Sequence, residues 1–143
     1  MHISEVIRRK GDEVVTISPD ASVSDLLAML AEKGIGAVVV SDDGGESLVG
    51  IVSERDVVRH LHLHGPGVLQ GTVATIMTTA VMTCSPEDDL EALARQMTEH
   101  RFRHVPVVVD GRLYAIVSIG DIVKHRIDEL QHERDQLFGY IQG

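Results

Sequence analysis

The chain has 143 residues, 43% of them hydrophobic, and a formal net charge of −9. This length allows one ordinary domain or two small ones that share a core. The acidic balance argues against a nucleic-acid-binding protein, whose affinity usually depends on a basic surface. No apolar run approaches the roughly 20 residues that a membrane span requires, and the first residues lack the apolar stretch of a secretory signal. We therefore expect no nucleic-acid partner and no membrane.

The cysteine content bears on the cellular compartment. Cys84 is the single cysteine, so no internal disulfide can form. A chain without disulfides fits a reducing environment, and we expect a cytoplasmic protein.

The first half of the chain predicts alternating strands and helices after a short lead-in over residues 1–10. Ser22 is a suitable N-cap, and glycines end the helix that it begins. A run that is apolar at every position predicts a strand buried on both faces. The expected elements are a strand over 14–17, a helix over 22–34, strands over 37–40 and 48–52, and a helix from 54.

The second half repeats this order. Thr16 matches Thr83 and Val38 matches Val105, and beyond a hairpin that is two residues shorter, Asp56 matches Asp121. Length variation confined to a turn is typical of a structural repeat. The expected elements are an entering strand near 83–84, a helix over 89–100, strands over 105–109 and 113–117, and one long helix over 121–142, with a break near Gly139 as the alternative.

The residues that join the last strand of each half to the following helix form a corner, over residues 50–56 in the first half and 115–121 in the second. The first corner reads Gly-Ile-Val-Ser-Glu-Arg-Asp and the second Ala-Ile-Val-Ser-Ile-Gly-Asp. The first turn of a helix offers unpaired N–H groups and a partial positive charge, which suit a phosphate. Ser-x-x-Asp is also a capping-box variant. A role limited to beginning a helix is therefore the alternative, and the spacing leaves it open.

Together these features resemble a tandem pair of cystathionine-β-synthase (CBS) domains, also called a Bateman module. The corner over 50–56 is similar to the ligand motif of that family, Gly-apolar-x-Ser/Thr-x-x-Asp, and Arg103-His104-Val105-Pro106-Val107 resembles the stretch before the second central strand. The resemblance implies an α/β (α+β) fold of two β-α-β-β-α repeats related by a pseudo-twofold axis. We expect a lead-in and first domain over 1–72, a second domain over 73–130 and a helical tail over 131–143, in a stand-alone CBS domain-containing protein.

The resemblance implies a sensor rather than an enzyme. Such pairs bind AMP, ADP, ATP, S-adenosylmethionine or NAD(H) in two clefts between the repeats, and they commonly form homodimers that regulate another protein. Asp56 and Asp121 are expected to accept hydrogen bonds from ribose. The residues implied at the first site are Lys10, Thr16, Ile17, Gly36, Ala37, Val38, Gly50, Ser53, Arg55 and Asp56. Those implied at the second site are Thr83, Ser85, Arg101, Arg103, His104, Val105, Pro106, Ser118 and Asp121.

Two other features allow different interpretations. The apolar residues of the last helix recur at three, four or seven positions, which is typical of a stripe that packs on its own domain or on a second copy. His60, His62 and His64 are candidate metal ligands, but no nearby cysteine or carboxylate completes a set, so we expect no metal. The alternative functions are a structural or dimerisation module with unused clefts and, with less support, a metal-binding protein.

Overall fold

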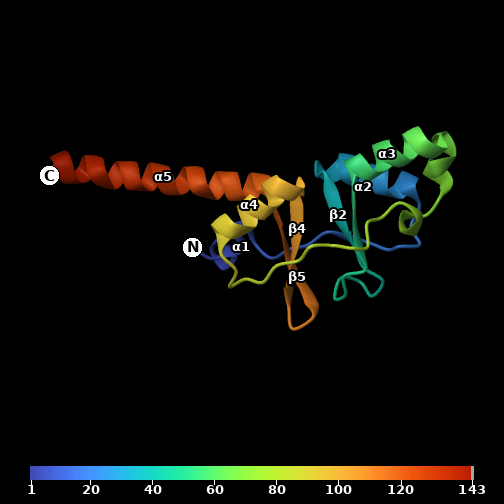
Figure 1. The fold of residues 1–143 in the computed structure, drawn as a ribbon, viewed down its shortest axis with the longest axis horizontal. Helices are drawn as coiled ribbons and strands as arrows, with labels where there is room; N and C mark the ends of the chain where they lie inside the picture. Colours follow the sequence, from blue (N-terminus) through green and yellow to red (C-terminus); the bar gives the residue numbers. More distant parts are fainter. Residues whose placement is uncertain (143) are drawn as a thin grey trace.

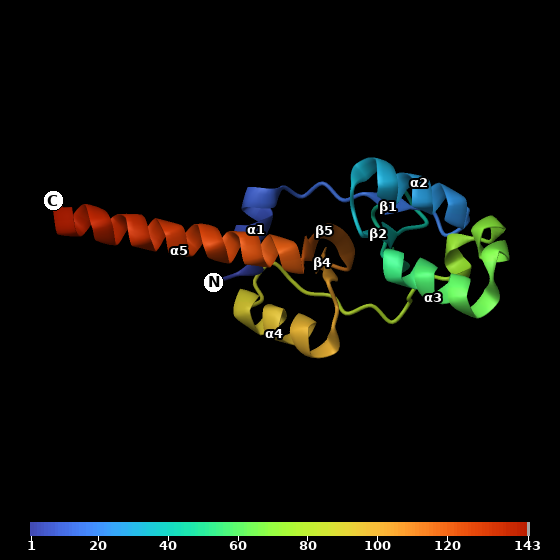
Figure 2. The same cartoon turned by 90° about the horizontal axis from the view of Figure 1, so that it is seen from above.

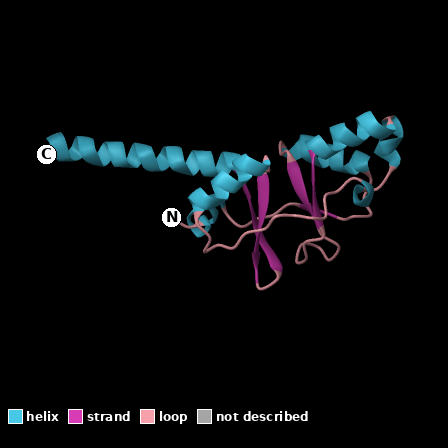
Figure 3. Ribbon diagram, viewed as in Figure 1, coloured by secondary structure: helices cyan, strands magenta, loops and turns pink. Residues whose placement is uncertain are grey.

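Two small β-sheets lie side by side in the middle of the molecule, with helices packed around them (Figures 1 and 3). The computed structural model describes residues 1–142. The helices are α1 (Ile3–Lys10), α2 (Val23–Lys33), α3 (Glu54–His64), α4 (Leu90–His100) and α5 (Ile119–Gln142), with short 3-10 turns η1 (Pro66–Gln70) and η2 (Val73–Thr75). The strands are β1 (Thr16–Ile17), β2 (Ala37–Val40), β3 (Gly50–Ser53), β4 (His104–Val109) and β5 (Arg112–Ser118).

The two sheets have equivalent topology, which confirms the predicted duplication. In the first sheet, β1 runs parallel to β2 and β2 runs antiparallel to β3. In the second sheet, β4 and β5 are antiparallel, and the entering strand is reduced to a parallel bridge between Cys84 and Val107. Because Val39 and Val107 each have a chain on both sides, the central strand of each half is buried, as its uninterrupted apolar run predicts.

The helices begin where their capping residues predict. The Ser22 side chain accepts a hydrogen bond from the Asp25 amide at 3.0 Å, and Asp89 accepts one from the Ala92 amide at 2.9 Å. Each satisfies an N–H group that has no partner within its own helix. At the other end of α2, Gly34 adopts the left-handed conformation that commonly terminates a helix.

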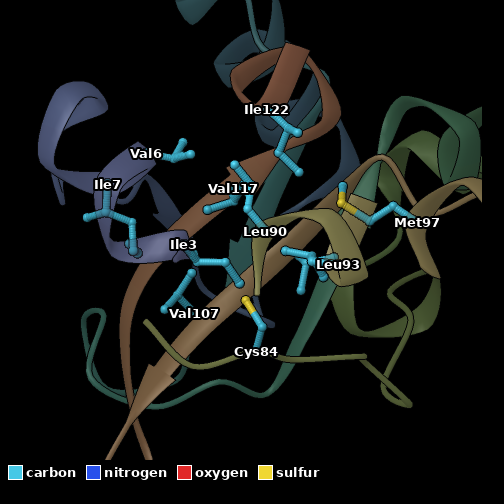
Figure 4. Close-up of a cluster of buried hydrophobic side chains, with 12 residues drawn as sticks. Ile3, Val6, Ile7, Cys84, Leu90, Leu93, Met97, Val107, Val117 and Ile122 are labelled. Atoms are coloured by element: carbon cyan, nitrogen blue, oxygen red, sulfur yellow. The ribbon is translucent and has the colours of Figure 1, made fainter. Parts of the chain in front are cut away.

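Each repeat is preceded by a lead-in segment, residues 1–15 for the first repeat and the equivalent residues 68–82 for the second. The two segments are exchanged, since each packs against the other repeat. Helix α1 contributes Ile3, Val6 and Ile7 to the hydrophobic core formed by α4, β4 and β5 (Figure 4). Val73 and Ile76 of the second lead-in segment pack into the core of the first repeat instead. Full burial of an aliphatic side chain contributes about 1.5–3 kcal/mol, so these crossed contacts bind the two repeats together.

Cys84 lies inside the core around α4 and does not reach a site. Its side chain packs with Leu90 and Leu93. Burial, with the Asp88 carboxylate as a lesser cause, raises the pKa of the Cys84 thiol to about 12. A thiol with this pKa is not a nucleophile near neutral pH, and Cys84 acts as a small core side chain.

Helix α5 is a single element that extends far beyond the rest of the molecule (Figure 1). The alternative of a break near Gly139 is not observed, because the helix continues to Gln142 and nothing lies against Gly139. Only Ile122 and His125 of α5 are buried, where α1 and α4 pack on either side of its base (Figure 2). Large apolar side chains remain exposed along the rest of the helix; they are Val123, Ile127, Leu130, Leu137, Phe138, Tyr140 and Ile141.

Candidate functional site

The first corner forms a complete capping box at the start of α3. The amide of Ser53 donates to Oδ2 of Asp56 at 2.9 Å, and the Asp56 amide donates back to the Ser53 hydroxyl at 3.4 Å. Ser53 and Asp56 therefore cap α3, which is the role that the sequence left open for them. Because a capping box uses part of the hydrogen-bonding capacity of the carboxylate, it leaves room for further partners.

The other oxygen of Asp56 faces residues that come from outside the corner. Oδ1 accepts a hydrogen bond from Arg59 at 2.9 Å and a longer one from the Thr78 hydroxyl at 3.4 Å. Asp56 is only 6% exposed, whereas the Arg59 side chain is 55% exposed. A nearly buried carboxylate with a solvent-facing cation as partner can exchange that partner for the hydroxyl groups of a ligand.

The second corner repeats the capping geometry but has a different external partner. The Ser118 amide donates to Oδ2 of Asp121 at 2.9 Å, and the Asp121 amide donates to the Ser118 hydroxyl at 3.0 Å. The ammonium of Lys10 also lies against Oδ2 of Asp121. Burial alone raises the pKa of Asp121, but the hydrogen bonds from Lys10 and Ser118 outweigh it and hold that pKa below its usual value.

A cleft of about 490 Å³ opens between the two corners. Its volume lies within the range typical of small-molecule sites. Both repeats contribute to its walls, and the first corner contributes more. The lining residues are Gly36, Ala37, Ile51, Ser53, Glu54, Arg55, Asp56, Arg59, Thr78, Ala80, Val81, Met82, His100, Arg101, Phe102, Arg103, His104, Ser118, Ile119 and Gly120.

Positive charge dominates the polar part of this cleft. Its four arginines are Arg55, Arg59, Arg101 and Arg103, against the two carboxylates of Glu54 and Asp56. Guanidinium groups bind phosphate through paired hydrogen bonds, so the lining suits an anionic ligand despite the acidic balance of the whole chain.

Arg101 occupies a backbone conformation that arginine rarely adopts. Its φ is 60°, in the left-handed region, at the position where the first repeat has Gly34 with φ 63°. A side chain in this conformation costs about 1 kcal/mol or more relative to glycine. The second repeat therefore carries local strain at a residue that lines the cleft, which is typical of functional positions.

His104 lines the cleft in surroundings that favour the uncharged form of its ring. Burial lowers the pKa of His104, and the positive charges of Lys10 and Arg103 lower it further, while Asp121 and Glu54 act in the opposite direction. A neutral imidazole offers one donor and one acceptor, which suits the edge of a base.

Nine of the residues that the sequence implicates line the cleft, and they come from both expected sites. They are Gly36, Ala37, Ser53, Arg55, Asp56, Arg101, Arg103, His104 and Ser118. The cleft thus takes Arg101, Arg103 and His104 from the residues expected at the second site, and Arg55 and Asp56 from those expected at the first.

The entering strands do not line the cleft, because of the sheet register. Thr16 pairs with Val39 and Ile17 with Val40, near the hairpin end of β2, whereas the cleft meets the opposite end of that strand at Ala37. Thr83 precedes the equivalent bridge at Cys84.

Other expected site residues have structural partners instead. The Ser85 hydroxyl donates to Glu87 at 2.9 Å in the turn before α4. Val38 and Val105 are core residues, and the Pro106 carbonyl accepts the Cys84 amide at 3.0 Å. Lys10, expected beside the first corner, lies at the second.

Gly50, implied at the first site, lies against the second lead-in segment. A side chain at this position would meet the carbonyl oxygen of Thr78 at 2.7 Å and the Met77 sulfur at 3.1 Å. Thr78 and Ile51 exchange backbone hydrogen bonds of 2.8 and 3.0 Å. Gly50 therefore makes room for the second lead-in segment, which in turn brings Thr78 to Asp56.

Sequence reasoning missed the side of the cleft formed by Thr78, Ala80, Val81 and Met82. These residues belong to no regular element and carry no motif. The repeat alignment contains a signal for them, because an exchanged lead-in segment at one corner implies one at the other. Arg59 was also missed; its position one helical turn after Asp56 is the signal that points to it.

The histidines of α3 were the candidate metal ligands. Within residues 1–142 no group of three metal-ligating side chains comes together. The rings of His60 and His64 stack at a centroid distance of 5.7 Å on successive turns. The described helices also include none that is long and apolar enough to cross a membrane.

The duplicated fold with a cleft between its repeats defines a tandem CBS-domain pair. A family model for the CBS domain matches residues 3–63 and again residues 73–128. The chain therefore belongs to the CBS-domain family. Among curated relatives, the mitochondrial CBS domain-containing protein CBSX3 of Arabidopsis thaliana is 33% identical over 148 residues, covering 99% of this chain and 72% of the relative.

Solved structures of this family are similar over most of their length. A CBS-domain-containing protein of Agrobacterium tumefaciens has a TM-score of 0.84 and 42% identity, covering 88% of this chain and 99% of that chain. CBSX2, solved in complex with AMP, has a TM-score of 0.68 and 32% identity, covering 84% of this chain and 90% of that chain.

Proposed function

We propose that this protein is a regulatory module that binds an adenine nucleotide in the cleft between its CBS repeats. The observation that carries the proposal is the placement of the nearly buried Asp56 carboxylate beside four arginines in one cleft of about 490 Å³. A carboxylate that accepts hydrogen bonds from the two ribose hydroxyls would orient the sugar, each bond being worth about 1.5–3 kcal/mol. The complex of the related CBSX2 with AMP supports this choice of ligand class.

The parts of the cleft suggest how such a ligand would lie. With the ribose at Asp56 and Ser53, its phosphate would reach the N-terminus of α3 and the guanidinium of Arg55. His104 and the apolar side chains of Ile51, Val81 and Met82 would enclose the base. AMP, ADP, ATP and NAD(H) share this adenosine unit and differ in how many arginines they would engage.

We propose no chemical step for the bound nucleotide. The single cysteine is held in the core and does not reach the cleft. A ligand held by a carboxylate and fixed cations, without turnover, fits a sensor that acts on a separate protein. We place this sensor in the cytoplasm, where its unpaired buried cysteine is stable.

Thermal unfolding with and without AMP tests the proposal. Ligand at about 100 times its Kd should stabilise the wild-type protein by about 2.7 kcal/mol. The D56N variant should lose this response, because an amide is a weaker acceptor for both ribose hydroxyls than a carboxylate. D25N is the matched control, since Asp25 has the equivalent place in α2 and lies away from the cleft. An AMP response in D56N equal to that of the wild type would contradict the site.

A second function, homodimerisation, is favoured by α5. Val123, Ile127, Leu130, Leu137 and Ile141 recur with alternating steps that keep one stripe along the helix, and all are about half exposed or more. A repeat of 3.5 residues is what a second helix recognises in a coiled coil. We propose that a second copy of this chain covers the stripe.

A further inference from the structure

The two corners differ in what lies against their carboxylates. At the first corner, Asp56 lines the cleft and its external partners are the neutral hydroxyl of Thr78 and the largely exposed Arg59. At the second, Ser118, Ile119 and Gly120 line the cleft but Asp121 does not.

Lys10 is the external partner of the carboxylate at the second corner. Its ammonium donates to Oδ2 of Asp121 and, at 2.6 Å, to the carbonyl oxygen of Ile116. Ile116 is the equivalent of Ile51, whose backbone is bound by Thr78 at the first corner. Lys10 of the first lead-in segment and Thr78 of the second therefore approach equivalent places. Lys10 brings a cation there, and Thr78 brings a hydroxyl group.

The Lys10 contact is less open to solvent than the Arg59 contact at the first corner. The side chains of Lys10 and Asp121 are 29% and 25% exposed, whereas the side chain of Arg59 is 55% exposed. The end of α1 is held to α5 by a second ion pair, between Arg9 and Asp128 at 3.2 Å. A ribose hydroxyl at Asp121 would have to compete with a positive charge that already has two acceptors.

From this geometry we infer that each chain holds one nucleotide, at Asp56, and that Lys10 closes the equivalent site at Asp121. The inference rests on the proposed nucleotide function and adds its stoichiometry. Lys10 is here an internal competitor: while its ammonium occupies the Asp121 carboxylate, the second corner serves to tie α1 to α5. Removing the charge should open a second site of the same chemistry.

Isothermal titration with AMP, on wild type and a set of variants, tests the inference. Wild type should bind one AMP per chain, and D56N should bind none. K10M should bind two, and the double variant K10M/D56N should retain one, which D121N should then remove. R9M is the matched control, because it breaks the neighbouring ion pair with Asp128 and should still bind one AMP. K10Q, which keeps a donor without the charge, replaces K10M if that variant does not fold.

The outcomes separate this inference from the proposed function. Two AMP per wild-type chain, or one per K10M chain, would overturn the role of Lys10 and leave nucleotide binding intact. If wild type bound one AMP and only D121N, not D56N, abolished this binding, Lys10 would be a residue that contacts the nucleotide rather than a competitor. This result would also overturn the inference. No binding by wild type and one AMP per K10M chain would support the Lys10 closure and refute the Asp56 site, whereas no binding by any variant would refute both.

Discussion

The hydroxyl of Thr78 donates a hydrogen bond of 3.4 Å to Oδ1 of Asp56, although Asp56 belongs to the first repeat and Thr78 leads into the second. The first corner is therefore completed by the other repeat. Since the lead-in segments are exchanged, the cleft cannot form from one repeat alone, and a ligand in it would contact both.

Replacing Thr78 by valine should destabilise the protein by about 0.5–1.5 kcal/mol, because a nearly buried carboxylate loses one hydrogen bond without a change in side-chain volume. The measurement is urea unfolding followed by circular dichroism. T79V is the control, since Thr79 is exposed and its hydroxyl is not part of the corner. Equal effects of the two substitutions would show that the contact with Asp56 contributes nothing.

Replacing Gly50 by alanine should cost about 1–3 kcal/mol and weaken AMP binding, because the new methyl group would meet the Thr78 carbonyl at 2.7 Å and displace the second lead-in segment. Thermal unfolding and AMP titration measure the two effects. G67A provides the comparison, as nothing lies within 4 Å of a side chain there. A fully stable G50A variant with normal AMP affinity would contradict this role of Gly50.

Replacing Arg101 by glycine should separate stability from binding. R101G should raise the free energy of unfolding relative to R101A by about 1 kcal/mol, because glycine adopts φ near 60° without strain. Both variants lose the guanidinium and should bind AMP more weakly than the wild type. If R101G and R101A are equally stable, the left-handed backbone carries no strain.

The stability of the protein should decrease as the pH falls through the unfolded pKa of His104, near 6.5. The pKa of His104 is lowered on folding, so the unfolded chain binds the proton more readily, and the contribution is complete above 6.5 and lost below it. The H104Q variant should lose less stability between about pH 7.5 and 5.5 than the wild type. H62Q, at an exposed histidine of α3, should keep the wild-type slope, and an unchanged slope in H104Q would contradict the assignment.

Replacing Ile127 by glutamate should dissociate the proposed dimer, because it puts a charge in the middle of the apolar stripe of α5. Sedimentation velocity would measure the change in mass. Q136E is the control, since Gln136 is exposed and lies outside the stripe. A monomeric wild-type protein at all concentrations would refute the dimer.

The elements and their duplication could be predicted because their signals are local. Ser22 and Asp89 cap the helices that they were expected to begin, and the capping box at Ser53 follows directly from the spacing of its residues. Hydrogen bonds between residues three apart depend little on the rest of the molecule, so sequence patterns report them well.

The composition of the cleft was harder to predict, because it depends on register and on crossed packing. Because the register pairs Thr16 with Val39, Thr16 lies away from the cleft that Ala37 lines. No local sequence pattern specifies this register. The continuity of α5 through Gly139 was also hard to predict, because a glycine lowers helix propensity without necessarily ending a helix.

The chain by itself determined two repeats, two Ser-x-x-Asp corners and an apolar stripe on the last helix, because each arises from contacts between near neighbours. Only the tertiary structure decided which lead-in segment meets which corner. The apolar face of α1 would suit either core, and long-range packing selects the second, which carries Lys10 to Asp121 and leaves Asp56 to Thr78. That choice makes two similar corners chemically different.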